Sequence, residues 1–406
     1  MSSSDAIIRS AGAEFELMCL TARVGFDADA ASDSVRVIDA GMDWQTFLRN
    51  VERNYIAPLV YRNLKSITGA PIPAKVLETL RVRSKLTAFK SEQFAAELTR
   101  LSRALESQGI RTIHYKGAVA AHEFCGSVAA RNFNDLDFLV RREDLPALVR
   151  ILEQEGYANS LQLTAAQFEH YVREFKEFLF QRGEICLEPH WSLAGRRYRF
   201  DSDYEGFWRR SRILAFRDST LRVMSMEDSL LVLCLAGAKG RWKRLQMVSD
   251  IAACAGRFND QDWQNVSLRA AATGTLRILN LGLLLAAELS GAKLPSHIAR
   301  SARESSTVRR LARKVASTLA TGRKPPRFLP DTPSFFSPLL FRQRESFRDR
   351  WIYLWHTTTT PNLNHLRHLP LPKLAYPLYR VIVPLHDFVV YPAWRMSQAL
   401  LARVRT

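Results

Sequence analysis

The sequence has little cysteine and no long apolar run. Its 406 residues include five cysteines, none in a C-x-x-C pair, and no uncharged apolar stretch reaches the ~18 residues of a membrane-spanning helix. An odd, low cysteine count in so large a chain argues against a secreted, disulfide-built protein. Charged residues scattered through positions 1–25 also break any apolar core of a secretion signal. We therefore predict a cytoplasmic protein with reduced thiols and no transmembrane helix.

Most familiar catalytic motifs are missing as well. The sequence has no P-loop, no G-x-G-x-x-G and no G-x-S-x-G, the motifs that would mark three large classes of enzyme. His122 and Glu123 begin a zinc-protease motif, but Gly126 stands where the second histidine is required. His365 and His368 lie three residues apart and would share a helix face, as two ligands of a metal ion do. Two solvated histidines in a basic segment are the simpler interpretation.

What the chain has in excess is basic charge, and that charge is unevenly placed. Lys and Arg number 58 against 40 Asp and Glu, a net charge of +18. Residues 301–406 hold 18 basic and 5 acidic residues, a net charge of +13, so the first 300 residues carry only +5. This distribution favours a nearly neutral body with a basic C-terminal segment over a uniformly basic nucleic-acid-binding protein. Such a segment should attract phosphates, nucleic acid or an anionic membrane surface, so a peripheral contact of the segment with an anionic surface is one expectation.

The basic C-terminal segment is also rich in Trp and Tyr. Aromatic side chains among basic ones suit a membrane interface or single-stranded nucleic acid. The simpler alternative, which we favour, is a set of helices packed on the body with their arginines reaching into solvent.

Apolar periodicity predicts an α+β protein with a small mixed β-sheet core and flanking helices. Helical spacing recurs over residues 43–65 and 76–108 and again over 228–239, 245–255 and 270–289, whereas residues 28–34 have the composition of a loop. Strand patterns cover residues 111–116 and 135–140, and a hairpin is expected at 177–190. Five prolines over residues 325–338 indicate a linker. We expect four parts: an N-terminal helical region (1–110), the α/β core (111–222), a C-terminal helical domain (223–322) and a basic Pro/aromatic-rich segment (323–406).

The most informative motif is the strand D-L-D-F-L-V. On a strand, residues i and i+2 point to the same face, so Asp135 and Asp137 lie side by side. Two neighbouring carboxylates repel each other unless a cation lies between them, and oxygen ligands suit Mg²⁺. Two such ions would hold nucleotide phosphates and activate an attacking oxygen. An exposed acidic pair at a strand end is the alternative.

Two further segments add to the acidic pair. In I-C-L-E-P-H, side chains alternate between the two faces of a strand, so Glu188 could join the aspartates from an adjacent strand. The alternative is an ordinary, partly buried glutamate with no role in metal binding. In H-Y-K-G-A, a strand runs into Gly117 at a helix start, where backbone N–H groups bind anions and Lys116 adds a positive charge.

This ordered set resembles the polymerase β-like nucleotidyltransferase superfamily, in particular its branch of uncharacterised nucleotidyltransferases. The resemblance rests on K-G-A, an arginine, D-L-D-F-L-V and E-P-H-W, and extends over roughly residues 40–390. It implies Gly117 and Ala118 at a phosphate-binding turn and Asp135, Asp137 and Glu188 as catalytic carboxylates and metal ligands. It also implies an NTP co-substrate, and it matches Arg131 to an arginine ahead of the acidic pair, for which we expect a triphosphate contact.

The expected reaction is Mg²⁺-dependent transfer of a nucleoside monophosphate from an NTP to an unidentified acceptor, a small molecule, sugar, peptide or protein. Lys239 and Arg241, in the basic run K-G-R-W-K-R, would close over the triphosphate, unless the run is a solvated face. Ala118 in place of Gly or Ser, and the sixteen residues between Ala118 and Asp135, depart from the superfamily pattern. These departures keep a second hypothesis open, a nucleotide-binding scaffold of the same fold with little or no activity.

Overall fold

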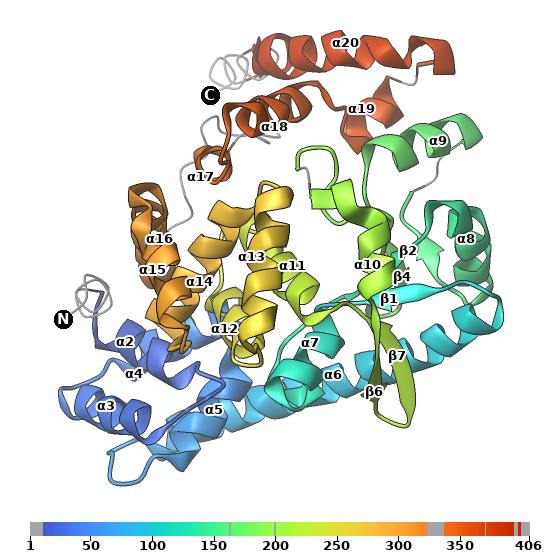
Figure 1. The fold of residues 1–406 in the computed structure, drawn as a ribbon. Coiled ribbons are helices and arrows are strands. Elements are labelled where there is room, and N and C mark those ends of the chain that lie inside the picture. Colours follow the sequence, from blue (N-terminus) through green and yellow to red (C-terminus); the bar gives the residue numbers. More distant parts are fainter. Residues whose placement is uncertain are drawn as a thin grey trace.

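The computed structural model describes residues 11–161, 164–198, 200–322, 337–369, 371–393 and 397–398. The N-terminal part consists of helices α2 (Ala13–Thr21), α3 (Ala28–Asp39), α4 (Trp44–Arg53), α5 (Ala57–Ser66) and α6 (Ala74–Ser107) (Figure 1). The loop predicted at residues 28–34 is wrong, because this segment is the first half of α3. Asp27 caps that helix by accepting from the backbone N–H of Ala30, and Val37 and Ile38 bury its inner face.

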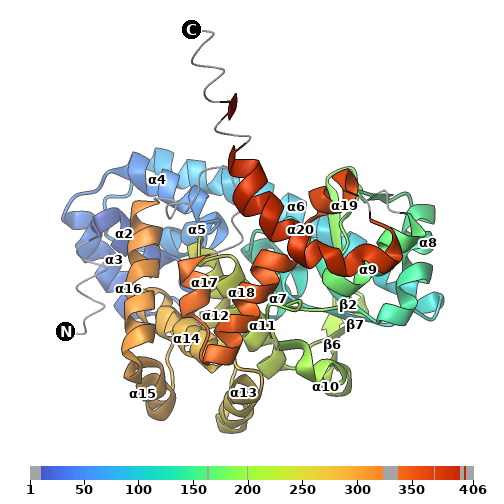
Figure 2. The ribbon, with the colours of Figure 1, turned by 90° about the horizontal axis from the view of Figure 1, so that it is seen from above.

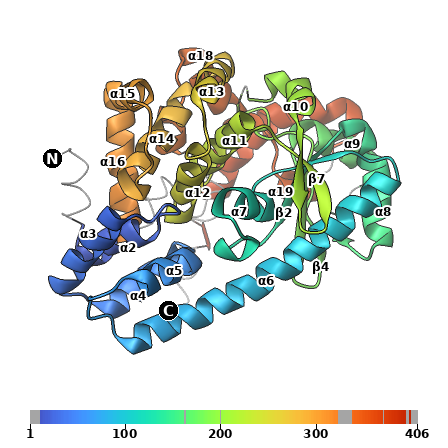
Figure 3. The same cartoon turned by 60° about the horizontal axis from the view of Figure 1, so that its bottom comes forward.

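The helix predicted over residues 43–65 is two helices. The break falls between α4 and α5, where Tyr55 has a φ of +60°, which a helix interior does not allow. The segment 76–108, predicted as one long helix or two, is the single helix α6, whose 34 residues run along one side of the molecule (Figure 3). Its N-terminal half packs in the helical core through Val76 and Leu80, and its C-terminal half packs against the sheet.

A seven-stranded mixed sheet forms the middle of the chain. Its strands are β1 (Thr112–His114), β2 (Leu136–Val140), β3 (Ala158–Asn159), β4 (Phe180–Arg182), β5 (Ile185–His190), β6 (Arg212–Phe216) and β7 (Ser219–Val223), in the order β3-β4-β5-β2-β1-β7-β6. The pairs β2/β5 and β1/β7 are parallel, and the others are antiparallel. The predicted strands at 111–116 and 135–140 are confirmed, and so is the hairpin that turns at Gly183.

Short helices connect these strands and cover the sheet. They are α7 (Gly117–Cys125), η1 (Val128–Ala130), η2 (Arg142–Asp144), α8 (Leu145–Gln154), α9 (Ala165–Glu174), η3 (Phe200–Asp203) and α10 (Tyr204–Arg210). Buried residues of the sheet, α6, α7 and α8 form one apolar core, which holds the acidic strand β2 in place.

A second helical group follows the sheet. It comprises α11 (Met226–Lys239), α12 (Leu245–Ala255), α13 (Asp260–Ala272), α14 (Leu276–Ser290), α15 (Ser296–Glu304) and α16 (Ser306–Thr321). The segment predicted as one helix at 270–289 is divided at Gly274, whose φ of +66° ends α13. These helices share a single apolar core with α2–α5. The helices that precede the sheet in the sequence therefore pack against those that follow it.

The C-terminal elements lie across one side of the molecule, with α20 outermost (Figures 1 and 2). They are α17 (Pro338–Arg342), α18 (Phe347–Thr359), α19 (Leu363–His368), η4 (Lys373–Leu378), α20 (Tyr379–Leu385) and the π-helical turn η5 (His386–Val390). Residues 325–336 of the predicted proline linker lie outside the described residues.

The predicted fold class is confirmed as α+β, with a mixed sheet and flanking helices. None of the helices in the described part of the chain has both the length and the apolar character that a membrane span requires. The boundaries of the four expected parts stay a prediction.

Candidate active site

The three acidic residues of the sequence motifs meet where the start of one strand lies beside the middle of its neighbour. Strands β2 and β5 are parallel, and their register places Asp137 directly opposite Glu188. Asp135 comes immediately before β2, on the same face as Asp137. All three side chains line one cavity of about 210 Å³, which Lys116 and Arg131 also line. We call it the acidic cavity.

Burial and mutual repulsion make this cavity electrostatically costly. Burial, followed by the charges of Asp137 and Asp135, raises the pKa of Glu188 to about 7. Burial and the charge of Asp137 also raise the pKa of Asp135. Burial acts on Asp137 too, but Lys116 and the hydrogen bond from His190 outweigh it and hold the pKa of Asp137 below its usual range. The cluster therefore carries more negative charge than its protein neighbours neutralise.

The donor set fits a hard divalent cation. Three carboxylates converge on the cavity, and ligand atoms of Asp137, Glu188 and His190 all lie within 4.8 Å of one another. Carboxylate oxygens are the ligands that Mg²⁺ prefers, and a cation between them would relieve the repulsion that raises the pKa values of Asp135 and Glu188.

Lys116 supplies the positive charge nearest to the aspartates. Its Nζ donates to Oδ1 of Asp137 at 3.0 Å. The backbone of Lys116 has φ +57° and ψ −153°, a region used almost only by glycine, so this residue is held in a strained conformation. Such strain persists only when the surrounding structure enforces it, and it is typical of binding sites.

Gly117 makes the turn from β1 into α7 close to the acidic strand. Its φ is +41°, and a Cβ atom there would lie 3.3 Å from the carbonyl oxygen of Asp135. A side chain at this position would therefore both strain the backbone and crowd the first aspartate. Gly117 lines the acidic cavity, whereas the next residue, Ala118, is buried in the sheet core.

Arg131 also lines the acidic cavity, but its guanidinium group already has a partner. Its Nε donates to Oδ1 of Asp250 at 2.8 Å, and its Nη2 donates to Oδ2 at 2.8 Å. Both side chains are largely buried, with 13% and 6% of their surface exposed. This two-pronged ion pair joins the segment before β2 to helix α12.

The structure does not bring the other two basic residues of the prediction to the acidic cavity. Nζ of Lys239, at the end of α11, donates to the carbonyl oxygen of Leu193 at 2.8 Å and lies beside a different cavity. Arg241 follows α11 with a φ of +58° and is not among the residues that line the acidic cavity. Arg244, from the same basic run, lines it instead, with its guanidinium carbon 3.7 Å from the ring centroid of Tyr55.

The sequence prediction missed His190, although it lies on the same strand face as Glu188. Nε2 of His190 is 3.0 Å from Oδ1 of Asp137, and Nδ1 is 3.1 Å from Oε2 of Glu177. Burial lowers the pKa of His190 to about 3, so the ring is neutral at neutral pH and its Nε2–H donates to ionised Asp137. Period-two spacing in I-C-L-E-P-H was the pattern that could have identified it.

A second cavity, of about 330 Å³, lies beyond His190 between the sheet body and the C-terminal segment. Its basic lining residues are Lys176, Arg196, Arg197, Lys239 and His356. Its acidic ones are Glu174, which pairs with Arg196 at 3.0 Å, and Glu177, which pairs with Lys176. We call it the cationic cavity. The side chains of Glu177, His190 and Asp137, in contact one after the other, lie between this cavity and the acidic cavity.

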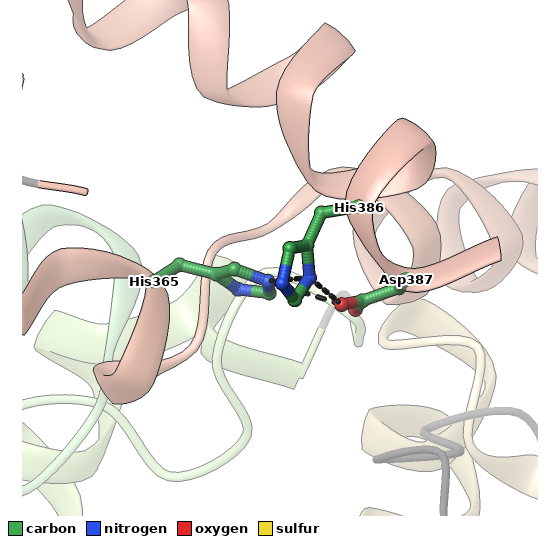
Figure 4. Close-up of side chains that lie close together, drawn as sticks. All are labelled: His365, His386 and Asp387. Atoms are coloured by element: carbon green, nitrogen blue, oxygen red, sulfur yellow. Dashed lines mark hydrogen bonds and ion pairs between the residues drawn. The ribbon is translucent and has the colours of Figure 1, made fainter. Parts of the chain in front are cut away.

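A cluster of His365, His386 and Asp387 ties α19 to η5 (Figure 4). Nδ1 of His365 accepts from the backbone N–H of Asn362, so the proton of a neutral His365 ring is on Nε2, which donates to Oδ1 of Asp387 at 3.0 Å. Nδ1 of His386 donates to the same oxygen at 2.8 Å. Because the cap at Asn362 uses the lone pair on Nδ1, Nε2 has none to offer a metal, and this network is a clamp between helices.

Against known proteins, the sequence matches the family described as uncharacterised nucleotidyltransferases over residues 40–291, more than half of the chain. The chain belongs to this family. It is therefore a nucleotidyltransferase, and the match does not define its acceptor. No curated protein matches the sequence.

Two solved structures show weak similarity. One is the antibiotic-resistance factor ANT(2'')-Ia, with 14% identity and a TM-score of 0.33 over 45% of this chain and 91% of that one. The other is an antigenic nucleotidyltransferase-like protein from Paracoccidioides brasiliensis, with 13% identity and a TM-score of 0.31 over 53% and 98%. Similarity at this level assigns neither a substrate nor site residues to the present chain.

Proposed function

We propose that this nucleotidyltransferase moves a nucleoside monophosphate group from an NTP to an acceptor and releases pyrophosphate. A hydroxyl oxygen or other nucleophile of the acceptor forms a bond to the α-phosphorus, the bond to the bridging oxygen of pyrophosphate breaks, and the acceptor loses its proton. The observation that carries the proposal is the convergence of Asp135, Asp137 and Glu188 in one cavity of a chain from this family.

In this proposal Asp135, Asp137 and Glu188 hold divalent cations, with Mg²⁺, as two ions, the best match to their oxygens. Bound Mg²⁺ neutralises phosphate charge and polarises the reacting phosphoryl group. Glu188, as a ligand of one ion, would also help to take up the proton that the acceptor loses. His190 holds Asp137 in position through its Nε2–H.

The triphosphate would lie along the turn at Lys116 and Gly117. The first backbone N–H groups of α7, with that of Ala118 among them, would donate to a phosphate bound there. With a metal ion bound to Asp137, Lys116 would give up its hydrogen bond to this carboxylate and donate to a phosphate oxygen instead. Arg131 would stabilise the developing negative charge from its fixed position beside Asp250.

We infer that the acceptor approaches through the cationic cavity and carries a negative charge. In-line displacement places the acceptor and the leaving pyrophosphate on opposite sides of the α-phosphorus, and the cationic cavity lies beyond His190 from the phosphate turn. Arg196, Arg197 and Lys239 favour an anionic group, whereas burial lowers the pKa of Lys176 to about 6 and that of His356 to about 4, so both are mostly uncharged at neutral pH. Tyr198 and Tyr353 add aromatic surface for a ring. Lys239 therefore has a proposed place in acceptor binding, while Arg241 keeps only its predicted role at the triphosphate.

Calorimetric titration with each of the four NTPs, with and without Mg²⁺, tests the proposed site. Wild-type protein is expected to bind at least one NTP in a Mg²⁺-dependent manner, and Asp135→Asn/Asp137→Asn is expected to abolish this binding. Asp29→Asn/Asp33→Asn, an exposed pair on α3, is the matched control. Folded wild-type protein that binds no NTP under either condition would contradict the proposal.

The alternative is a nucleotide-binding scaffold with little turnover. Ala118, and the engagement of Lys116 and Arg131 with protein carboxylates, are the observations in its favour. Mg²⁺-dependent NTP binding without pyrophosphate release, across sugar, peptide and small-molecule acceptors, would distinguish it from the enzyme. We also retain a cytoplasmic location as a proposal, supported by five free cysteines.

A further inference from the structure

The C-terminal segment presents apolar side chains to solvent where a helix would ordinarily carry polar ones. Along the continuous helix formed by α20 and η5, Tyr379 and Val383 face inward and are buried. On the opposite side, Val381, Leu385, Phe388 and Val389 recur every three or four residues and are each between 53 and 59% exposed. The outer surface of this helix is therefore apolar, while its inner surface holds Tyr379, Val383 and the buried Asp387.

Helix α18 continues the same exposed surface. Trp351 is 58% exposed and Trp355 is 40% exposed, one helical turn apart, while Tyr353 points inward and is buried. The guanidinium carbon of Arg380 on α20 lies 6.0 Å from the ring centroid of Trp355, so the two exposed surfaces adjoin. Figure 2, which looks onto this side, shows α18 and α20 side by side. We define the C-terminal apolar face as Trp351, Trp355, Val381, Leu385, Phe388 and Val389.

The exposed charges of the C-terminal segment itself are of one sign. Arg342, Arg348, Arg367 and Arg380 are exposed. Among the described residues between 337 and 393, no acidic side chain is exposed: Asp349 and Asp387 are buried, and Glu345 accepts from the backbone N–H of Arg277. Residues 301–406 as a whole carry a net charge of +13.

We propose that the C-terminal apolar face docks on the surface of an anionic lipid bilayer. Exposed tryptophans and aliphatic residues on one side of a helix, with arginines around them, are the pattern that places a helix at the boundary between head groups and acyl chains. Monomeric proteins rarely expose a contiguous apolar surface of this kind without a partner. The exposed arginines of the C-terminal segment select an anionic bilayer, because a neutral one would offer no charge complement.

The proposal is independent of the nucleotidyl-transfer reaction, because the face and the acidic cavity share no residue. Its test is flotation of the full-length protein, without nucleotide, with vesicles of phosphatidylcholine alone or of phosphatidylcholine and phosphatidylglycerol at seven to three. Wild-type protein is expected to float with the anionic vesicles, and to be released as salt is raised.

Two pairs of substitutions distinguish binding through the C-terminal apolar face from nonspecific adsorption to vesicles. Leu385→Ser/Phe388→Ser is expected to lower the apparent affinity for anionic vesicles by at least about tenfold, because two apolar side chains leave the interface. Leu86→Ser/Phe89→Ser, a still more exposed Leu/Phe pair on α6, is expected to bind like wild type. Val381→Ser supplies a milder variant of the same face in case the double variant melts at a lower temperature than wild type.

Three outcomes would overturn the proposal. In one, wild-type protein stays at the bottom of the gradient with anionic vesicles. In another, the α20 and α6 double variants float equally well. In the last, wild-type protein does not float but dimerises in light scattering, and Leu385→Ser/Phe388→Ser abolishes the dimer, which would assign the face to a second copy of this chain.

Discussion

Arg131 and Asp250 form a two-pronged ion pair between residues 119 positions apart in the sequence, with both N–O distances at 2.8 Å. The pair connects the segment that leads into the acidic strand β2 with helix α12 of the helical group. Because both side chains line the acidic cavity, the contact fixes one wall of that cavity as well as the position of the two parts of the fold.

We expect this ion pair to be energetically coupled. Asp250→Asn and Arg131→Gln should each lower the free energy of unfolding by about 3 to 5 kcal/mol, because each leaves a buried charge without its partner. The double variant should lose less than the sum of the two single variants. Chemical denaturation of all four proteins measures the coupling, and additive losses would show that the two groups act independently.

The strained backbone at Lys116 predicts an unusual order of stability. Because φ is +57° and ψ is −153°, Lys116→Gly should be more stable than Lys116→Ala by about 1 to 2 kcal/mol, although both lose the ion pair with Asp137. At exposed Lys85 in the interior of α6, Lys85→Ala should instead be more stable than Lys85→Gly by about 1 kcal/mol. Urea unfolding of the four variants tests this, and alanine above glycine at both positions would remove the argument for strain.

Glu188 should be required for metal-dependent nucleotide binding, whereas the nearby Glu184 should not. Glu188→Gln removes a carboxylate from the cluster with Asp137 and should weaken Mg²⁺-dependent NTP binding by about tenfold or more. Glu184→Gln, an exposed position just before β5, should leave binding unchanged. Calorimetry compares the two, and equal affinities would remove Glu188 from the proposed metal site.

The cationic cavity predicts a separation between nucleotide and acceptor binding. Arg197→Gln should lower the affinity for an anionic probe such as phenyl phosphate by about tenfold, because a charge-assisted contact is lost, and should leave Mg²⁺–NTP binding intact. Asp135→Asn/Asp137→Asn should do the opposite. A probe that competes with NTP, or whose binding ignores Arg197, would place the anion elsewhere.

Burial of His114 predicts a loss of stability in acid. Burial lowers the pKa of His114 to about 3 from an unfolded value near 6.5, so protonation favours the unfolded chain. The contribution of the neutral ring is fully present above pH 6.5 and declines as the pH falls toward 3, by about 2 kcal/mol at pH 5.

Denaturation curves of wild type and His114→Gln across this range measure that decline. The stability difference between them should shrink as the pH falls, since the variant has no ring to protonate. His297→Gln, at an exposed position, controls for histidine replacement in general. Parallel curves for wild type and His114→Gln would contradict the assignment.

The local parts of the candidate site followed from the sequence. Alternation in D-L-D-F-L-V places Asp135 and Asp137 on one side of a strand whatever the strand pairs with, and the position of Gly117 at a strand-to-helix turn is equally local. Where composition was the only guide, prediction failed. The small residues of 28–34 form a helix because Asp27 caps it and Val37 and Ile38 find a core to bury in.

The amino-acid sequence by itself determined the strand with its acidic pair, the basic C-terminal segment and the α+β class, because periodicity and charge are properties of neighbouring residues. Only the tertiary structure decided that Asp137 lies opposite Glu188, that Arg131 binds Asp250 rather than solvent, and that Lys239 lies beside a separate cavity. These contacts join segments far apart in the chain, and they depend on how the whole apolar surface is buried and on which charges must then be neutralised.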